Sequence, residues 1–219
     1  MNSEQINKAI RALGERDATM LRLIELCEPY AVRPRRDRFA RLIKAIVGQQ
    51  LATTAASAIN KRVTSFFGGS PTPDALIAAS DEDLRALGVS KAKIAAMKDL
   101  ASKVVSGEPP LSALGRKSDA EIVEALTRVR GVGPWTAQMF LIFTLARPDV
   151  LPTTDLGVRK AIRDNYRFAD LPTPKQIESL AARRKWAPYR SIASWYLWRS
   201  LELERRERGR KIAKVSDTF

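Results

Sequence analysis

Residues 130–135 read RGVGPW and join two stretches of helical character, SDAEIVEALTRV (118–129) and TAQMFLIFTLA (136–146). We expect Gly131 to take a positive φ angle and to end the first helix, because glycine has no Cβ that opposes this conformation. Gly133 then lets another group approach the backbone, at a point where the next helix begins with unpaired N–H groups. Such a helix N-terminus is a favourable anion site, although the same spacing is also typical of an ordinary tight connection between helices.

The composition predicts a folded protein with a polyanionic partner. The chain has 219 residues, of which 45% are hydrophobic, enough for a core in one domain or two small lobes. Its formal net charge is +14, which favours a nucleic acid or an anionic membrane surface as partner. The N-terminus lacks a signal-peptide core and no apolar run reaches membrane-spanning length. We therefore expect a soluble protein of the cytoplasm or nucleoid, with no membrane span.

Two features of the composition restrict the possible chemistry. The chain has no histidine and a single cysteine, Cys27. A histidine general base, a serine–histidine triad and a histidine-ligated metal are therefore excluded, as are an internal disulfide and a four-cysteine zinc or iron–sulfur site. Any catalysis must use carboxylates, hydroxyls, lysines, aromatic side chains or backbone groups.

The pattern of apolar residues predicts an all-α fold. No stretch shows the alternation of a β-strand. Thr72, Ser80 and Ser118 are expected N-caps, and Ser118 forms a capping box with Glu121. The helix that follows the hairpin is apolar nearly all round and should be buried. The expected helices span residues 4–26 (with a break near Gly14), 38–48, 52–66, 73–79, a short segment ending at Gly88, 90–105, 119–129, 134–146, 155–165, 174–185 and 189–204.

Five segments together resemble the DNA glycosylase superfamily that carries a helix-hairpin-helix element and includes endonuclease III. LTRVRGVGPWTAQMF resembles its hairpin, and LPTTDLGVRKAI resembles the segment with its catalytic aspartate. AIVGQQLATTAASAI and LGVSKAKIAAMKDLA are similar to two further segments, and WAPYRSIASWYLW to the C-terminal helix of the DNA-3-methyladenine glycosylase II branch. The segments follow the family order from about residue 38 to 202. Arg130 departs from the pattern, because a proline is common there.

The resemblance implies a single domain, residues 1–219, with two helical lobes and the site in the cleft between them. The middle lobe would span about 38–146, the N- and C-terminal helices would form the other lobe, and 205–219 would be a basic tail that frays. We expect these 219 residues to leave no room for the extra N-terminal β domain of larger relatives. The implied protein is a monomer that acts on double-stranded DNA containing damaged bases. It needs no metal or cofactor, apart from a structural monovalent cation at the hairpin when DNA is bound.

Asp155 is the candidate catalytic residue. Its local sequence favours a helix N-cap, because it precedes LGVRKAI. The resemblance implies that its carboxylate faces the sugar of an extruded nucleotide and stabilises positive charge there; both roles are compatible near the start of a helix. O-glycosidases usually need two carboxylates, since a poor leaving group requires an acid. A purine alkylated at N3 or N7 already carries positive charge and leaves without protonation, so one carboxylate suits alkylated purines.

Tryptophans define the expected base pocket. The bifunctional members of the superfamily carry a lysine at the position of Trp135, whose amine forms a Schiff base with the sugar. The tryptophan closes this route, so the resemblance implies a monofunctional hydrolase that leaves an intact abasic site. We place Trp135 and Trp198 in the pocket, where an indole attracts a cationic base. Met139 lies where a relative carries tyrosine, and Trp186 and Trp195 are expected to pack in the core.

The remaining candidates concern DNA binding. A base must leave the duplex before it reacts, and an apolar wedge can fill the gap. The resemblance assigns the wedge to Leu51 and contacts with the bases around the gap to Gln50; the alternative is a core leucine beside a polar turn. The hairpin residues Gly131, Gly133 and Thr136 are expected to hold a DNA phosphate.

The sequence does not decide between two roles for the basic residues. Arg33, Arg35, Arg36, Arg38 and the run 205–214 either bind phosphates or form solvated surface. Two other functions also remain compatible with the sequence. One is a helix-hairpin-helix module that binds DNA structure without catalysis, and the other is a glycosylase for deaminated or oxidised bases.

Overall fold

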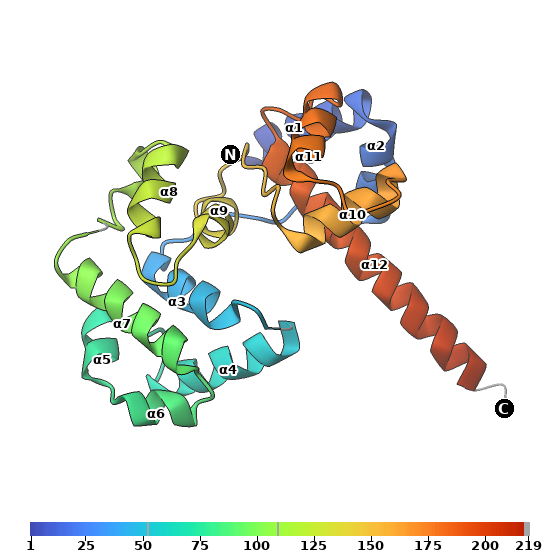
Figure 1. Cartoon of the computed structure of the whole chain (residues 1–219). Coiled ribbons are helices and arrows are strands. Elements are labelled where there is room, and N and C mark those ends of the chain that lie inside the picture. The colour runs from blue at the N-terminus through green and yellow to red at the C-terminus, as the bar shows by residue number, and fades with distance from the viewer. Residues whose placement is uncertain (52, 109, 217–219) are drawn as a thin grey trace. The chain divides into compact units, whose positions relative to one another are not determined.

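The computed structural model describes residues 1–51, 53–108 and 110–216, and within these ranges it contains α-helices, one short 3-10 helix and no strand. The predicted all-α class is therefore confirmed. The chain divides into two compact units (Figure 1). The first unit comprises Met1–Arg33 and Ala146–Phe219, and the second unit comprises Pro34–Leu145.

The first unit is built around the C-terminal helix. Helices α2 and α10 pack against α12, and α1 packs against α2 (Figure 1). Its core contains fully buried side chains from all five helices, among them Leu13, Met20, Val158, Ile177 and Tyr196. The helices of this unit are α1 (Ser3–Arg16), α2 (Ala18–Leu26), α10 (Leu156–Tyr166), α11 (Pro174–Arg183) and α12 (Arg190–Ser216).

The N-terminal pair of helices is interrupted at Asp17, so the predicted break near Gly14 was wrong by three residues. Gly14 lies inside α1, whereas Asp17 is the N-cap of α2 and accepts the backbone N–H of Thr19 at 3.0 Å. The other carboxylate oxygen accepts the Trp186 indole N–H at 2.9 Å and the Tyr166 hydroxyl at 2.7 Å. An aspartate that satisfies free helix N–H groups restarts a helix, which a glycine alone does not.

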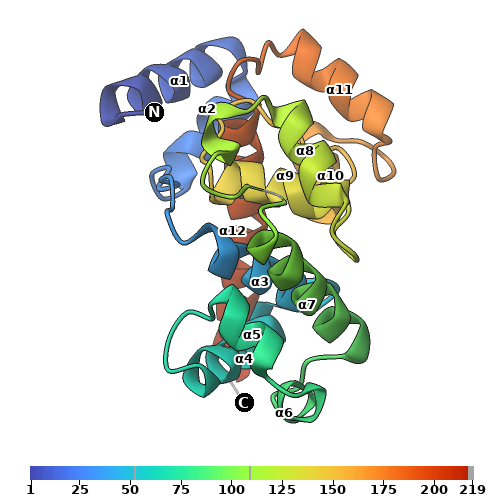
Figure 2. The same ribbon diagram turned by 90° about the vertical axis from the view of Figure 1, so that its left-hand side faces the viewer.

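The second unit packs its helices around α3 and α7. Helix α5 lies along α7, while α3 contacts α4, α7 and α9 (Figure 2). Thr72, Ser80 and Ser118 cap α5, α6 and α8 as predicted, and the capping box of Ser118 and Glu121 is complete. The elements of this unit are α3 (Arg38–Gly48), α4 (Thr53–Phe66), α5 (Pro73–Ala78), α6 (Asp81–Ala86), α7 (Lys91–Val105), the 3-10 helix Leu114–Arg116, α8 (Asp119–Thr127) and α9 (Pro134–Phe143).

Helix α9 is shorter and less buried than the sequence predicted. It ends at Phe143 instead of 146, where Ala146 takes a φ angle of +53° and Pro148 follows. A positive φ angle is incompatible with a right-handed helix, so α9 cannot continue through Ala146. Trp135 and Phe143 remain 38% and 40% exposed, so two aromatic side chains of this apolar helix face outward.

Helix α12 is longer than predicted. The expected end was residue 204 with a fraying basic tail, but the helix continues to Ser216. The segment after 204 is rich in arginine and lysine, which are good helix formers, and contains no proline. Ala52, the first residue of the predicted helix 52–66, and residues 217–219 of the predicted tail lie outside the described residues.

None of the described helices combines the length and the apolar character that a membrane span requires.

Candidate active site and nucleic-acid interface

The hairpin between α8 and α9 uses its two glycines differently. Gly131 has a φ angle of +73°, as predicted, and a Cβ there would lie 3.2 Å from the Cβ of Ala96. Gly133 is the N-cap of α9 with extended backbone, and a Cβ there would meet nothing within 4 Å. Pro134 occupies the first turn of α9 as predicted. The fold therefore requires a glycine at 131, whereas nothing within the second unit requires one at 133.

The hairpin is held by Gln49, at the end of α3. The side-chain amide of Gln49 donates to the carbonyl oxygen of Gly131 and to the hydroxyl oxygen of Thr136, both at 3.0 Å. Thr136 is 2% exposed. Its hydroxyl is therefore used inside the second unit, and its expected contact with a phosphate stays a prediction.

A lysine supports the same turn from α7. The ammonium group of Lys93 donates to the carbonyl oxygens of Val47 and Gln49, both at 2.8 Å. Burial lowers the pKa of Lys93. Carbonyl groups at a helix C-terminus lack partners within the helix. The ammonium group of Lys93 supplies such partners and stabilises the C-terminal end of α3.

A second contact holds the hairpin at Arg130. The Asp99 carboxylate accepts the backbone N–H of Arg130 at 2.8 Å and pairs with Lys103 at 2.6 Å. Burial by itself would raise the pKa of Asp99, but the hydrogen bonds from Lys103 and Arg130 outweigh it and lower that pKa. Sequence reasoning missed Gln49, Lys93 and Asp99 as supports. The only local signal was their occurrence in the QQL and KAKIAAMKD segments that resemble the family.

The turn after α3 presents an apolar side chain to solvent. Gln50 is exposed and has a φ angle of +56°, a conformation that is uncommon for residues other than glycine. Leu51 is 37% exposed. The alternative of a core leucine is therefore wrong, while the roles of Leu51 as wedge and of Gln50 at the gap stay predictions.

Asp155 combines burial with a helix N-cap. It is 9% exposed and precedes α10. One of its carboxylate oxygens, Oδ1, accepts the backbone N–H of Val158 at 2.8 Å and the indole N–H of Trp198 at 2.8 Å. The N-cap that the local sequence favoured is confirmed. A buried carboxylate with fixed donors is preorganised to stabilise a positive charge nearby.

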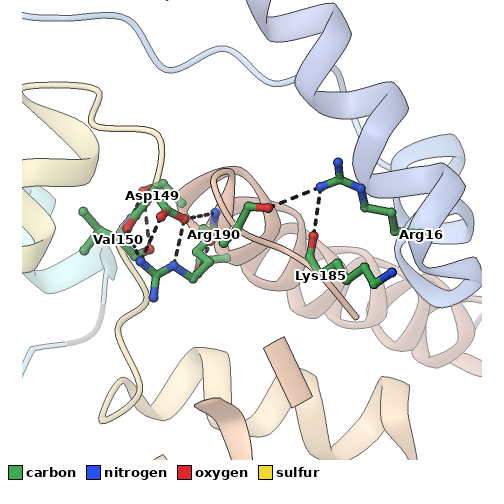
Figure 3. Close-up of polar contacts among 8 residues, drawn as sticks. Arg16, Asp149, Val150, Lys185 and Arg190 are labelled. Atoms are coloured by element: carbon green, nitrogen blue, oxygen red, sulfur yellow. Dashed lines mark hydrogen bonds and ion pairs between the residues drawn. The ribbon is translucent and has the colours of Figure 1, made fainter. Parts of the chain in front are cut away.

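The segment that leads to Asp155 is fastened to the start of α12. The guanidinium of Arg190 binds the Asp149 carboxylate at 2.7 and 2.9 Å (Figure 3), and the Ser191 hydroxyl accepts the N–H of Val150 at 2.8 Å. Figure 3 also shows Arg16 donating to a backbone carbonyl of Lys185, just before this helix. Helix α12 therefore contacts the segment 149–155 through Arg190 and Ser191 at its start and through Trp198 two turns later.

The remaining tryptophans divide into two groups. Trp186 is fully buried and Trp195 is 9% exposed, so both pack in the core as predicted. Trp135 lies in the first turn of α9 and Met139 is half-buried on the same helix, in the second unit. Trp198 is half-buried in the first unit. The structure brings Trp198 to Asp155 within one unit, and the pocket roles of Trp135, Trp198 and Met139 stay predictions.

The basic residues near position 35 do not behave alike. Arg33, Arg35 and Arg36 are exposed. Arg38 is half-buried, and its guanidinium donates to the carbonyl oxygens of Leu111 and Ser112. Arg38 therefore has a structural use inside the second unit, which the sequence did not indicate.

Comparisons with known proteins identify one family model and several similar sequences. A family model described as the HhH-GPD superfamily base excision DNA repair protein matches residues 43–188. The chain is 36% identical over 206 residues to DNA-3-methyladenine glycosylase 1 of Schizosaccharomyces pombe. The match covers 90% of this chain and 89% of that protein. It is 32% identical over 239 residues to the DNA-3-methyladenine glycosylase of Saccharomyces cerevisiae, and this match covers 90% of this chain and 80% of that protein.

A solved structure extends the similarity to three dimensions. The 3-methyladenine DNA glycosylase of Schizosaccharomyces pombe, in complex with abasic DNA, superposes with a TM-score of 0.78 at 36% identity. The match covers 87% of this chain and 95% of that chain. The family resemblance that the sequence segments predicted is confirmed.

Proposed function

Because this chain belongs to the HhH-GPD superfamily of base excision DNA repair proteins, we propose that it is a monofunctional DNA glycosylase for alkylated purines. Its substrates are 3-methyladenine-type and 7-methylguanine-type bases in double-stranded DNA, and it hydrolyses the N-glycosidic bond. The names of the relatives support this substrate class. The observation that carries the proposal is the buried Asp155 carboxylate, which two N–H donors hold at the start of α10.

The chemistry needs one carboxylate and a water molecule. When the bond between the sugar and an alkylated purine breaks, both electrons go to the base, which leaves as a neutral molecule. Positive charge develops on the deoxyribose, and the Asp155 carboxylate stabilises it. Water then adds to the sugar and loses a proton. The chain contains no histidine, and this route needs no histidine to protonate the leaving base.

The absence of lyase activity follows from the residue at position 135. A Schiff base with the sugar requires an amine, and Trp135 has none. The product is an intact abasic site, and strand cleavage needs a later treatment with alkali or another enzyme. Trp135 and Trp198 supply indole rings that attract a cationic base, an interaction of about 0.5–2 kcal/mol. Met139 lies on the same helix as Trp135, and we propose that it also contributes to base binding.

DNA binding involves the hairpin and the turn after α3. The backbone of Gly131 and Gly133, together with the start of α9 at Thr136, holds a phosphate, an interaction that helix N-termini favour. Leu51 fills the space of the extruded base and Gln50 contacts the neighbouring bases. A net charge of +14 supports a polyanionic partner. The protein acts as a monomer on chromosomal DNA, in the cytoplasm or nucleoid.

The test is release of methylated bases from alkylated duplex DNA by the wild type and by Asp155→Asn. Single-turnover rates are measured with enzyme in excess, and affinity is measured on DNA that carries a stable abasic-site analogue. We expect the substitution to lower the rate about 100-fold or more, while the protein stays folded and binds the analogue. Strand breaks are counted before and after hot alkali to test for lyase activity.

Each outcome has a defined meaning. Equal release by both proteins removes Asp155 from the chemistry. Strand breaks before alkali contradict the monofunctional reaction. Release of hypoxanthine or uracil but of no methylated base overturns the substrate class. Binding to the analogue without release of any base indicates a DNA-binding module instead of an enzyme.

A further inference from the structure

The first turn of α10 contains a glycine directly beneath the Trp198 indole. A Cβ at Gly157 would lie 2.9 Å from Cδ1 and 3.0 Å from Nε1 of Trp198, and 3.0 Å from Oδ1 of Asp155. The 2.9 Å distance is shorter than real Cβ contacts, the two 3.0 Å distances are tighter than nearly all of them, and the indole is a rigid ring. A side chain at 157 would therefore displace the indole from the carboxylate, the carboxylate from its cap, or both.

The backbone does not explain this glycine. Gly157 lies inside a helix and has no positive φ angle. Glycine in a helix destabilises the fold by about 0.5–1 kcal/mol relative to alanine. The feature that alanine would disturb is the close approach of Trp198 to Asp155.

We propose that Trp198 and Gly157 are positioning residues for the Asp155 carboxylate. The indole N–H of Trp198 and the backbone N–H of Val158 converge on Oδ1 of Asp155, both at 2.8 Å, and fix its rotation. Gly157 provides the space in which the indole reaches the carboxylate. This inference rests on the proposed function of Asp155 as the catalytic residue. It gives Trp198 a role through its N–H edge, which is distinct from stacking of its ring face on a base.

The other end of the first unit provides an internal comparison. Asp17 is also a helix N-cap that accepts an indole N–H, from Trp186 at 2.9 Å. There the two kinds of donor use different oxygens: Oδ1 accepts the cap N–H of Thr19, and Oδ2 accepts the indole. The residue two positions after Asp17 is a threonine, so this contact needs no glycine. Trp186→Phe therefore removes the same type of hydrogen bond away from the proposed site.

The experiment compares Gly157→Ala, Trp198→Phe, their double variant and the control Trp186→Phe. Single-turnover release of methylated bases is measured at saturating enzyme, together with Kd for DNA that carries an abasic-site analogue and the melting temperature. We expect Gly157→Ala and Trp198→Phe each to lower the rate between about 10- and 100-fold. Kd should change less than about threefold, since the DNA-binding residues of the second unit are unaltered.

The double variant tests whether the two residues act through one contact. Residues that act as a unit have non-additive effects, so the double variant should be no slower than Trp198→Phe. Trp186→Phe should lower the melting temperature and leave the rate of the folded protein unchanged. A wild-type rate in Gly157→Ala, or rate losses that multiply in the double variant, would overturn the proposal.

A readout without activity separates this inference from the proposed function. The indole ¹H–¹⁵N signal of Trp198 is assigned by its loss in Trp198→Phe. Asp155→Asn and Gly157→Ala should both shift it, and Trp186→Phe should not. If Gly157→Ala leaves this signal in place, the positioning contact is overturned whatever the activity. If the signal shifts as expected but the wild type releases no base, the contact stands and the proposed function fails.

Discussion

The side-chain amide of Gln49 donates a 3.0 Å hydrogen bond to the carbonyl oxygen of Gly131, 82 residues later in the chain. A second 3.0 Å bond runs from the same amide to the hydroxyl oxygen of Thr136. One side chain thereby joins the end of α3 to the hairpin that begins α9. Because Leu51 follows Gln49 by two residues, the turn with the proposed wedge and the hairpin with the proposed phosphate site share one support.

Gln49→Ala should weaken both features at once. The substitution removes this donor from the exposed carbonyl of Gly131, where water can replace it, and from the buried hydroxyl of Thr136. A buried group that loses its partner costs about 1–3 kcal/mol. We expect a lower free energy of unfolding in urea and weaker binding to DNA with an abasic-site analogue. The neighbouring, exposed Gln50 serves as the control for stability, and Gln50→Ala should change it by less than about 0.5 kcal/mol. Equal stability of Gln49→Ala and wild type would contradict the coupling.

The two hairpin glycines should respond differently to alanine. Gly131→Ala places a Cβ at a φ angle of +73° and 3.2 Å from Ala96, so it should destabilise the fold by about 1 kcal/mol or more. Gly133→Ala meets no protein atom within 4 Å and should leave the melting temperature unchanged. We expect Gly133→Ala nonetheless to weaken DNA binding at least about tenfold, because its methyl group would occupy the space of a bound phosphate. Unchanged affinity of a folded Gly133→Ala would remove the hairpin from DNA binding.

Leu51→Ala tests the wedge. The side chain is 37% exposed, so its loss should affect stability by no more than about 0.5 kcal/mol. Extrusion of a base costs a few kcal/mol in a paired duplex and less where the base is mismatched. The single-turnover rate should therefore fall more for a methylated base in a paired duplex than for the same base opposite a mismatch. A loss of equal size on both substrates would argue against a wedge.

Asp99→Asn should reveal a pH-dependent support of the hairpin. The pKa of Asp99 is lowered from its ordinary value of 3.8, so its ionised form stabilises the fold above that value, and this contribution is lost as the pH falls through the folded value. We expect Asp99→Asn to melt at a lower temperature than wild type at pH 7, and the difference to shrink as the pH approaches 3. Asp170→Asn, which removes a carboxylate at an exposed loop position, serves as the control for the change in net charge. A difference that stays constant from pH 7 to pH 3 would contradict this assignment.

Features that depend on near neighbours could be predicted from the sequence. The capping box of Ser118 and Glu121, the positive φ angle of Gly131 and the N-cap at Asp155 all arise within about four residues, where local hydrogen bonds and steric limits decide the conformation. Where Gly14 and Asp17 were both local signals for a helix break, the predicted position of the break was wrong. Gly14 was expected to interrupt the first helix, but the carboxylate of Asp17 caps the next one.

By itself, the sequence determined the helical class, most helix boundaries and the hairpin, and it supplied Asp155 as the proposed catalytic residue, because each has a local or family pattern. Only the tertiary structure decided which side chains hold the hairpin and the Asp155 carboxylate in place. Trp198 reaches Asp155 across 43 residues and Gln49 reaches Gly131 across 82. No periodic pattern in the sequence indicates such pairs, because their contact depends on how α12 packs on α10 and how α3 packs on α9. The physical reason is that helix formation is governed by neighbouring residues, whereas the orientation of a carboxylate is governed by whatever the packed helices bring against it.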